Sequence, residues 1–258
     1  MASFFVLAFA LTWLLQVPAV AAKWGFLPGG PEPYLPLAAL GVLGPAIAAS
    51  VLTAREGGRP ALRALYARLL LWRVPLRYYL VGLVVPGLCL SALLWLLRLA
   101  GREGPIAYFP SMPRLIAGVV IAFGEEIGWR GYALPRLTQR FGAFAASGLI
   151  GVMWTLWHIP MFLGAGVPLS LLVVMLLFFT GGSLLFTWIY QGTSGSLLLA
   201  VCAHVGAHLD NSHAALPGDA LPVVVHAIVY AALGLALMRP PRPLPVDGRP
   251  VRKLESFQ

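Results

Sequence analysis

Two adjacent glutamates, Glu125 and Glu126, interrupt an otherwise apolar stretch of the chain that begins at Leu115. The chain has only 9 acidic residues, and these two stand side by side where lipid or protein interior is expected. A carboxylate at membrane depth costs roughly 2.5–3.5 kcal/mol or more, so such residues usually mark a functional site. The pair therefore predicts a membrane enzyme or a transporter.

The composition is that of a membrane protein. Hydrophobic residues make up 59% of the chain and charged residues 10%, whereas a soluble domain carries about 25% charged residues. We predict an all-α, polytopic fold: one membrane domain over residues 1–258, with about eight transmembrane helices enclosing an intramembrane active site. The eight apolar segments, of which the seventh is short, are residues 3–22, 34–53, 78–100, 113–136, 142–163, 168–190, 195–209 and 220–238.

The net charge is +9. The basic residues are concentrated in alternate loops, which indicates membrane topology and argues against binding of nucleic acid. One set of loops carries thirteen basic residues: Arg55, Arg59, Arg63, Arg68, Arg73, Arg77, Arg136, Arg140, Arg239, Arg242, Arg249, Arg252 and Lys253. The opposite loops carry four: Lys23, Arg98, Arg102 and Arg114. The positive-inside rule therefore predicts a multi-pass protein of the cell membrane with both termini in the cytoplasm. The expected partners include the lipid bilayer and its anionic head groups.

Two segments lie outside the predicted spans. Residues 55–77 combine leucines at helical spacing with arginines between them, which predicts an amphipathic helix on the cytoplasmic membrane surface. Residues 239–258 are rich in proline and charge and are predicted to form a flexible cytoplasmic tail. The first apolar segment has no Lys or Arg before it, so we expect a span and not a cleaved signal peptide. Cys89 and Cys202 both fall within spans, so no disulfide framework is expected.

Glu126 and Arg130 are four residues apart, with the acid N-terminal, which is the favourable order for an ion pair on a helix. Such a pair neutralises one carboxylate and fixes the helix face. Glu125 points about 100° away and cannot share Arg130 equally. We therefore expect Glu125 to have no ionic partner and to serve as a general base or acid.

Three histidines also fall inside apolar segments. His158 follows Trp154 by four residues and precedes Pro160. His204 and His208 are four residues apart and share one helix face. Two glutamates and three histidines at membrane depth are more than packing requires. A further histidine, His226, has no evident partner and is predicted to be structural.

These residues resemble the motifs of the CPBP family, the CAAX proteases and bacteriocin-processing (Abi) enzymes that include the Ras-converting endopeptidase. The resemblance is carried by Glu125-Glu126-xxx-Arg130, by an aromatic residue followed by xxx-His at Trp154 and His158, and by the run leading into His204. It extends in motif order and span count over residues 35–240. Two positions depart from the family pattern: Trp154 stands where phenylalanine is usual, and His208 stands where asparagine is usual.

The resemblance implies an eight-helix intramembrane endopeptidase with no cofactor. Glu125 and His158 would activate a water molecule, and His204 and His208 would stabilise the tetrahedral oxyanion, a term often worth several kcal/mol. Glu126 and Arg130 would support the site. The substrate would be a membrane-associated peptide or protein. Few lysines with abundant Ala, Arg, Gly and Pro are typical of a GC-rich bacterial genome, so a substrate other than a prenylated CAAX protein is expected.

Three alternatives stay open at this point. His158, His204 and His208 could bind Zn²⁺, with Glu125 as base or ligand, because three protein ligands and a water make a catalytic zinc site. A proton-coupled transporter would also place Glu and His within spans. A catalytically inactive membrane adaptor would keep the fold alone. Counting residues along the helices adds one difficulty: His158 lies about 24 Å beyond Gly142, deeper than Glu125 and His204.

Overall fold

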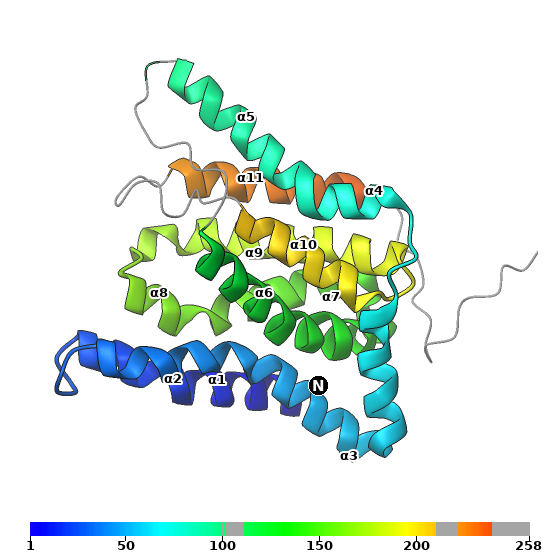
Figure 1. Ribbon diagram of the computed structural model, residues 1–258, viewed down its shortest axis with the longest axis horizontal. Coiled ribbons are helices and arrows are strands. Elements are labelled where there is room, and N and C mark those ends of the chain that lie inside the picture. Colours follow the sequence, from blue (N-terminus) through cyan, green and yellow to red (C-terminus); the bar gives the residue numbers. More distant parts are fainter. Residues whose placement is uncertain (100, 102–110, 210–220, 239–258) are drawn as a thin grey trace, which may run out of the picture.

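The computed structural model describes residues 1–99, 101, 111–209 and 221–238, and every regular element in these ranges is helical. The predicted all-α class is therefore confirmed. The predicted tail at 239–258 lies outside the described residues. Figure 1 shows most of the helices running roughly side by side, as in a membrane bundle.

Each of the eight apolar segments falls on a helix or on consecutive helical segments. The first is α1 (Ala2–Lys23), and the second comprises η1 (Glu32–Tyr34), α2 (Leu35–Leu40), η2 (Gly41–Leu43) and the start of α3 (Gly44–Ala67). The third is α4 (Leu76–Tyr79), η4 (Leu80–Val84) and α5 (Val85–Leu99). The fourth and fifth are α6 (Met112–Glu126), η5 (Ile127–Ala133), α7 (Leu134–Trp157) and α8 (Ile159–Ala165). The last three are α9 (Leu172–Gly192), α10 (Leu197–Leu209) and α11 (Leu221–Leu237), with short turns η3 (Arg68–Leu70) and η6 (Leu169–Leu171) elsewhere.

Three helical stretches of the described chain are long and apolar enough to cross a bilayer by themselves: Ala2–Lys23, Glu32–Leu70 and Leu172–Gly192. Met112–Trp157 together with Ile159–Ala165 makes a fourth, bent by 43°. Leu197–Leu209 and Val223–Leu237 are apolar but shorter. The chain is therefore a helical membrane protein.

Glycines in the left-handed region break two of the long helices. Gly58 has φ of 63° within α3, and Gly142 has φ of 77° within α7. L-residues with a side chain rarely adopt this conformation. In Figure 1 the part of α3 beyond Gly58 turns across the end of the bundle. The helical part of the 55–77 prediction is thus confirmed as far as Leu70, and its position on a membrane surface stays a prediction.

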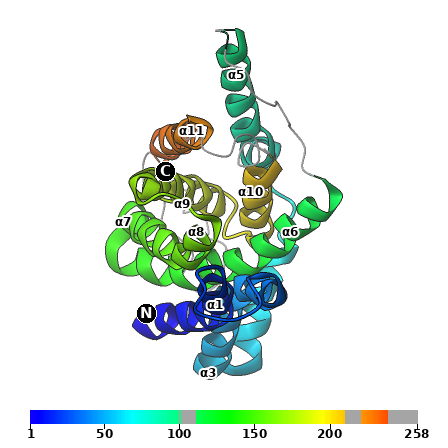
Figure 2. The same ribbon diagram turned by 90° about the vertical axis from the view of Figure 1, so that its left-hand side faces the viewer.

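The core is arranged around α9, which packs against α7 on one side and α11 on the other, while α6 packs against α10 and α1 against α3 (Figures 1 and 2). Small residues allow the closest contact: a side chain at Gly181 would collide with the backbone of Ala231. Helix association in membranes depends on such close packing because lipid is as apolar as the helices themselves.

Both described ends of the chain lie at the same end of the bundle. Near the start of α1, the ring of Phe4 stacks on Tyr132 at 5.1 Å. At the other extreme of the described chain, Met238 packs with Ala143 and Leu184. The arginine-rich segment closes this end, where Arg68 Nη1 donates to the hydroxyl of Tyr190 at 2.6 Å.

The outer faces of the helices carry large apolar side chains. Leu14 of α1 is 75% exposed, Leu99 of α5 is 77% exposed and Val173 of α9 is 74% exposed. Side chains of this kind all round a bundle are suited to lipid and not to water.

Candidate active site

The two glutamates lie where α6 passes into the wider π-helical segment η5. Glu125, Glu126 and Arg130 are 1%, 0% and 0% exposed. π-helical turns are frequent at functional sites. A side chain at Gly128 would collide with the backbone of Pro45, so this junction presses directly on the start of α3. The charged residues are therefore held within the protein and not in contact with lipid.

Glu126 accepts two hydrogen bonds on a single oxygen. Arg130 Nη1 lies 3.0 Å from Glu126 Oε1, and His204 Nδ1 lies 2.8 Å from the same atom. The ion pair expected from the four-residue spacing is present. The contact with His204 was not predicted, because it joins residues 78 positions apart.

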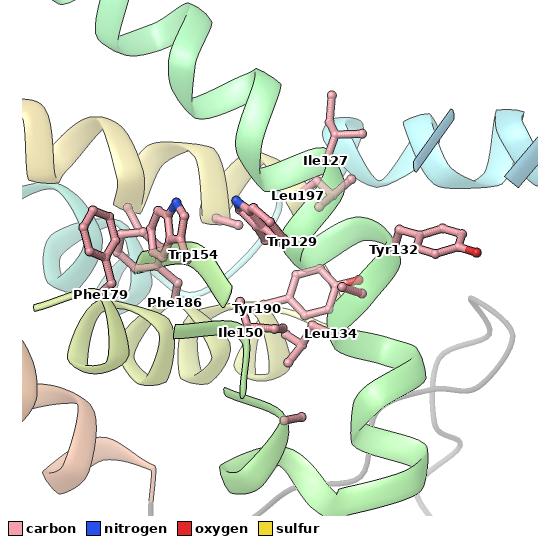
Figure 3. Packing of buried hydrophobic residues seen from close by; sticks show 14 of the residues in the cluster. Ile127, Trp129, Tyr132, Leu134, Ile150, Trp154, Phe179, Phe186, Tyr190 and Leu197 are labelled. Carbon is pink, nitrogen blue, oxygen red and sulfur yellow. The ribbon is translucent and has the colours of Figure 1, made fainter. Parts of the chain in front are cut away.

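Glu125 was predicted to have no ionic partner, and the bond that the structure shows for it comes from a neutral donor. The indole Nε1 of Trp154 donates a hydrogen bond to Glu125 Oε2. Arg130 does not reach this carboxylate in the bonds observed, because its guanidinium bonds to Glu126 and lies 4.7 Å from the centre of the Trp154 ring. Figure 3 shows the indole nitrogens of Trp154 and Trp129 pointing to the same side, toward the ribbon that leads into Ile127. In the sequence alone, Trp154 is only an aromatic residue in the place of phenylalanine.

His158 lies at the break between α7 and α8. Its Nδ1 is 2.8 Å from the carbonyl oxygen of Trp154, and its ring packs against Phe179 with centroids 4.3 Å apart. The difficulty over the depth of His158 does not arise in the structure, since Glu125, His158 and His204 line one cavity. Residues counted along a helix measure depth only if the helix is straight and normal to the membrane.

His204 and His208 stack on one face of α10. Their rings are 5.1 Å apart and inclined by 13°. Both line the same cavity as Glu125. His226, predicted to be structural, is buried in α11 against the ring of Phe178 at 4.8 Å, and it does not line that cavity.

The cavity has a volume of about 450 Å³ and two kinds of wall. Its polar residues are Gln16, Glu125, His158, His204 and His208. The rest is mainly apolar, including Met161, Phe162, Val167, Met175, Phe178 and Phe179. A chamber of this size can hold several side chains of an extended peptide, and its apolar wall suits apolar ones.

Gln16 of α1 was missed by sequence reasoning. It is 8% exposed, and its Oε1 has no hydrogen-bond partner among the residues that the structure describes. The signal in the sequence is a single glutamine within the first apolar segment, residues 3–22. A buried polar atom facing a cavity is a site for an ordered water or a ligand.

The proposed zinc ligands do not converge. Among the residues the structure describes, no three His, Cys, Asp or Glu side chains lie close enough together to hold a metal ion. The ring of Trp154 contacts both His158, at 6.2 Å between centroids, and His204, at 5.4 Å. The geometry gives no support to the zinc alternative.

Comparison with known proteins agrees with the motifs. The sequence model of the Type II CAAX prenyl endopeptidase Rce1-like family matches residues 108–209, which contain all six predicted site residues. CAAX prenyl protease 2 of Methanococcus maripaludis is 27% identical over 142 residues, covering 49% of this chain and 49% of that protein. The chain thus matches about half the length of this relative. In its motifs and over residues 108–209, the chain is similar to the CAAX-type proteases of the CPBP family.

Proposed function

We propose that the protein is an intramembrane endopeptidase of the CAAX-protease type, which hydrolyses a peptide bond in a membrane-associated peptide or protein. The single observation that supports this most is the buried cavity on which Glu125, His158, His204 and His208 meet an apolar wall. A protease needs a base, donors for the oxyanion and room for a peptide. A transporter or an inactive adaptor needs no such combination.

In the proposed reaction Glu125 is the catalytic base, assisted by His158. The oxygen of a water molecule attacks the carbonyl carbon of the scissile bond while Glu125 takes one of its protons. The carbonyl electron pair moves onto the oxygen. When the carbon–nitrogen bond breaks, the proton passes from Glu125 to the leaving nitrogen, giving a carboxyl group and an amine. No serine, cysteine or metal ion takes part.

His204 and His208 are proposed to donate to the oxyanion. Because the Nδ1 atom of His204 bonds to Glu126, its Nε2 atom must carry the proton that it donates. This requires either a doubly protonated ring or a proton held by Glu126 on the Nδ1 side. Glu126 is therefore proposed to orient His204 and to govern which of its nitrogens is protonated.

The substrate is proposed to enter from the membrane with apolar side chains against Phe162, Met175 and Phe178. The relative from Methanococcus maripaludis is named a CAAX prenyl protease; for this chain we propose only a membrane-associated peptide or protein. We also propose that both termini face the cytoplasm in the cell membrane, because thirteen basic residues lie in the loops on that side.

Purified protein in detergent, incubated with a library of fluorogenic peptides, tests the function. Cleavage by the wild-type protein and not by Glu125→Gln would support it. Uptake of a solute coupled to protons by reconstituted protein, without any cleavage, would instead favour the transporter.

A further inference from the structure

We propose that Trp154 is a positioning residue for the reaction, which holds the Glu125 carboxylate in its working orientation through the indole N–H. This inference rests on the proposed function, in which Glu125 is the base. The hydrogen bond from Trp154 Nε1 to Glu125 Oε2 carries it.

Trp154 is itself held firmly. It is 3% exposed, and its ring packs on Phe179 at 4.9 Å, on His204 at 5.4 Å and on Phe186 at 5.9 Å. The guanidinium of Arg130 lies 4.7 Å from the ring centre, within the range of a cation–π contact. A donor fixed on so many sides sets the direction of its hydrogen bond.

The charged and ionisable neighbours of Glu125 bond to Glu126 instead, so Trp154 is the donor that can orient the Glu125 carboxylate. Arg130 Nη1 and His204 Nδ1 both bond to Glu126 Oε1. Glu125 therefore accepts its hydrogen bond from a neutral donor. Its negative charge is not neutralised by that donor and can serve the proposed base. With Oε2 bonded to the indole, Oε1 is proposed to be the oxygen that faces the water molecule. Phenylalanine at position 154 would preserve an aromatic ring but could not make this bond.

The orientation of a catalytic group has a large effect on rate. Such groups must be held within about 0.5 Å of the productive geometry by surrounding contacts. A hydrogen bond to a charged group contributes about 1.5–3 kcal/mol, and each 1.36 kcal/mol corresponds to about tenfold in rate. Loss of the indole donor should therefore lower kcat by about 10- to 100-fold and leave KM within about twofold.

Replacement of Trp154 by 3-benzothienylalanine tests this at the level of one atom. Sulfur replaces the indole N–H, so the ring keeps its shape and loses only the donor. We expect the fall in kcat given above with an unchanged thermal midpoint. Trp154→Phe should show the same loss of kcat, with an additional effect of its smaller ring on stability. The same replacement at Trp13 is the matched control, because its indole donates to the carbonyl of Trp157 at 3.0 Å and it does not line the cavity.

A measurement independent of turnover separates this inference from the proposed function. In protein labelled with ¹⁵N at the indole nitrogen, the resonance lost in Trp154→Phe identifies Trp154. Glu125→Ala removes the acceptor, and we expect this resonance to move upfield more than any other indole resonance. Turnover at the wild-type rate with 3-benzothienylalanine at 154, or an indole resonance that does not respond to Glu125→Ala, would overturn the inference. A wild-type protein that cleaves no peptide, with the indole resonance still responding, would instead overturn the proposed function alone.

Discussion

His204 Nδ1 lies 2.8 Å from Glu126 Oε1, and this bond ties α10 to the junction of α6 and η5. The same oxygen accepts from Arg130, so Glu126 organises a buried cluster while the adjacent Glu125 bonds to a neutral indole and faces the cavity. Two identical neighbouring residues thus have different surroundings. Glu126 accepts from an arginine and a histidine, whereas Glu125 accepts from a neutral indole and is the proposed base.

Arg130→Ala should destabilise the protein. The substitution leaves Glu126 as a buried charge without its cation, which costs about 3–5 kcal/mol. We expect a lower thermal midpoint and a lower yield, together with lower activity. Arg140→Ala, which removes an exposed arginine of the same helical region, is the matched control and should melt as the wild type does. Unchanged melting of Arg130→Ala with complete loss of activity would mean that Arg130 acts directly on the substrate.

His204→Leu, which removes the donor, should have the opposite profile. Glu126 would keep its bond to Arg130, so the thermal midpoint should change little. Loss of a donor to the oxyanion costs about 10²–10³ in kcat, and we expect a loss of that size with KM nearly unchanged. Steady-state kinetics and thermal melting on the same preparation give both quantities. A variant that retains kcat would exclude His204 from the oxyanion site.

The bonds of Arg130 and His204 to Glu126 show which contacts could be predicted from the sequence and which could not. The four-residue spacing of Glu126 and Arg130 predicted their ion pair because both lie on one helix, where geometry is fixed locally. The bond from His204 depends on how α10 packs against α6, and no local rule reports that. Trp154 was misjudged for a related reason: as an aromatic residue it resembles phenylalanine in packing, and only the three-dimensional arrangement shows its N–H directed at Glu125.

The positions of the helices in the sequence could be predicted, but their bends and relative depths could not. Hydropathy located all eight apolar segments, since burial in lipid requires long apolar helices. The break at Gly142 coincides with the predicted boundary between the fourth and fifth segments. The depth of His158 was misjudged because counting residues assumes straight helices of common origin.

His208→Asn distinguishes the two chemical mechanisms. Asparagine can donate a hydrogen bond to an oxyanion as histidine does, so we expect substantial activity to be retained. Protein purified without metal-affinity resin should contain no stoichiometric metal. Elemental analysis that finds about one zinc per chain, lost together with cleavage in His208→Asn, would establish the metal mechanism instead.

The most direct test of the central claim is peptide cleavage by purified wild-type protein and by Glu125→Gln, followed by mass spectrometry of the products. Gln is close in size to Glu and can still accept the bond from Trp154, so the variant should remain folded and monodisperse. Loss of a general base typically costs about 10²–10⁴ in rate. We predict cleavage at a defined bond by the wild type and a loss of at least this size in the variant. Turnover by folded Glu125→Gln at a near-wild-type rate would contradict the account.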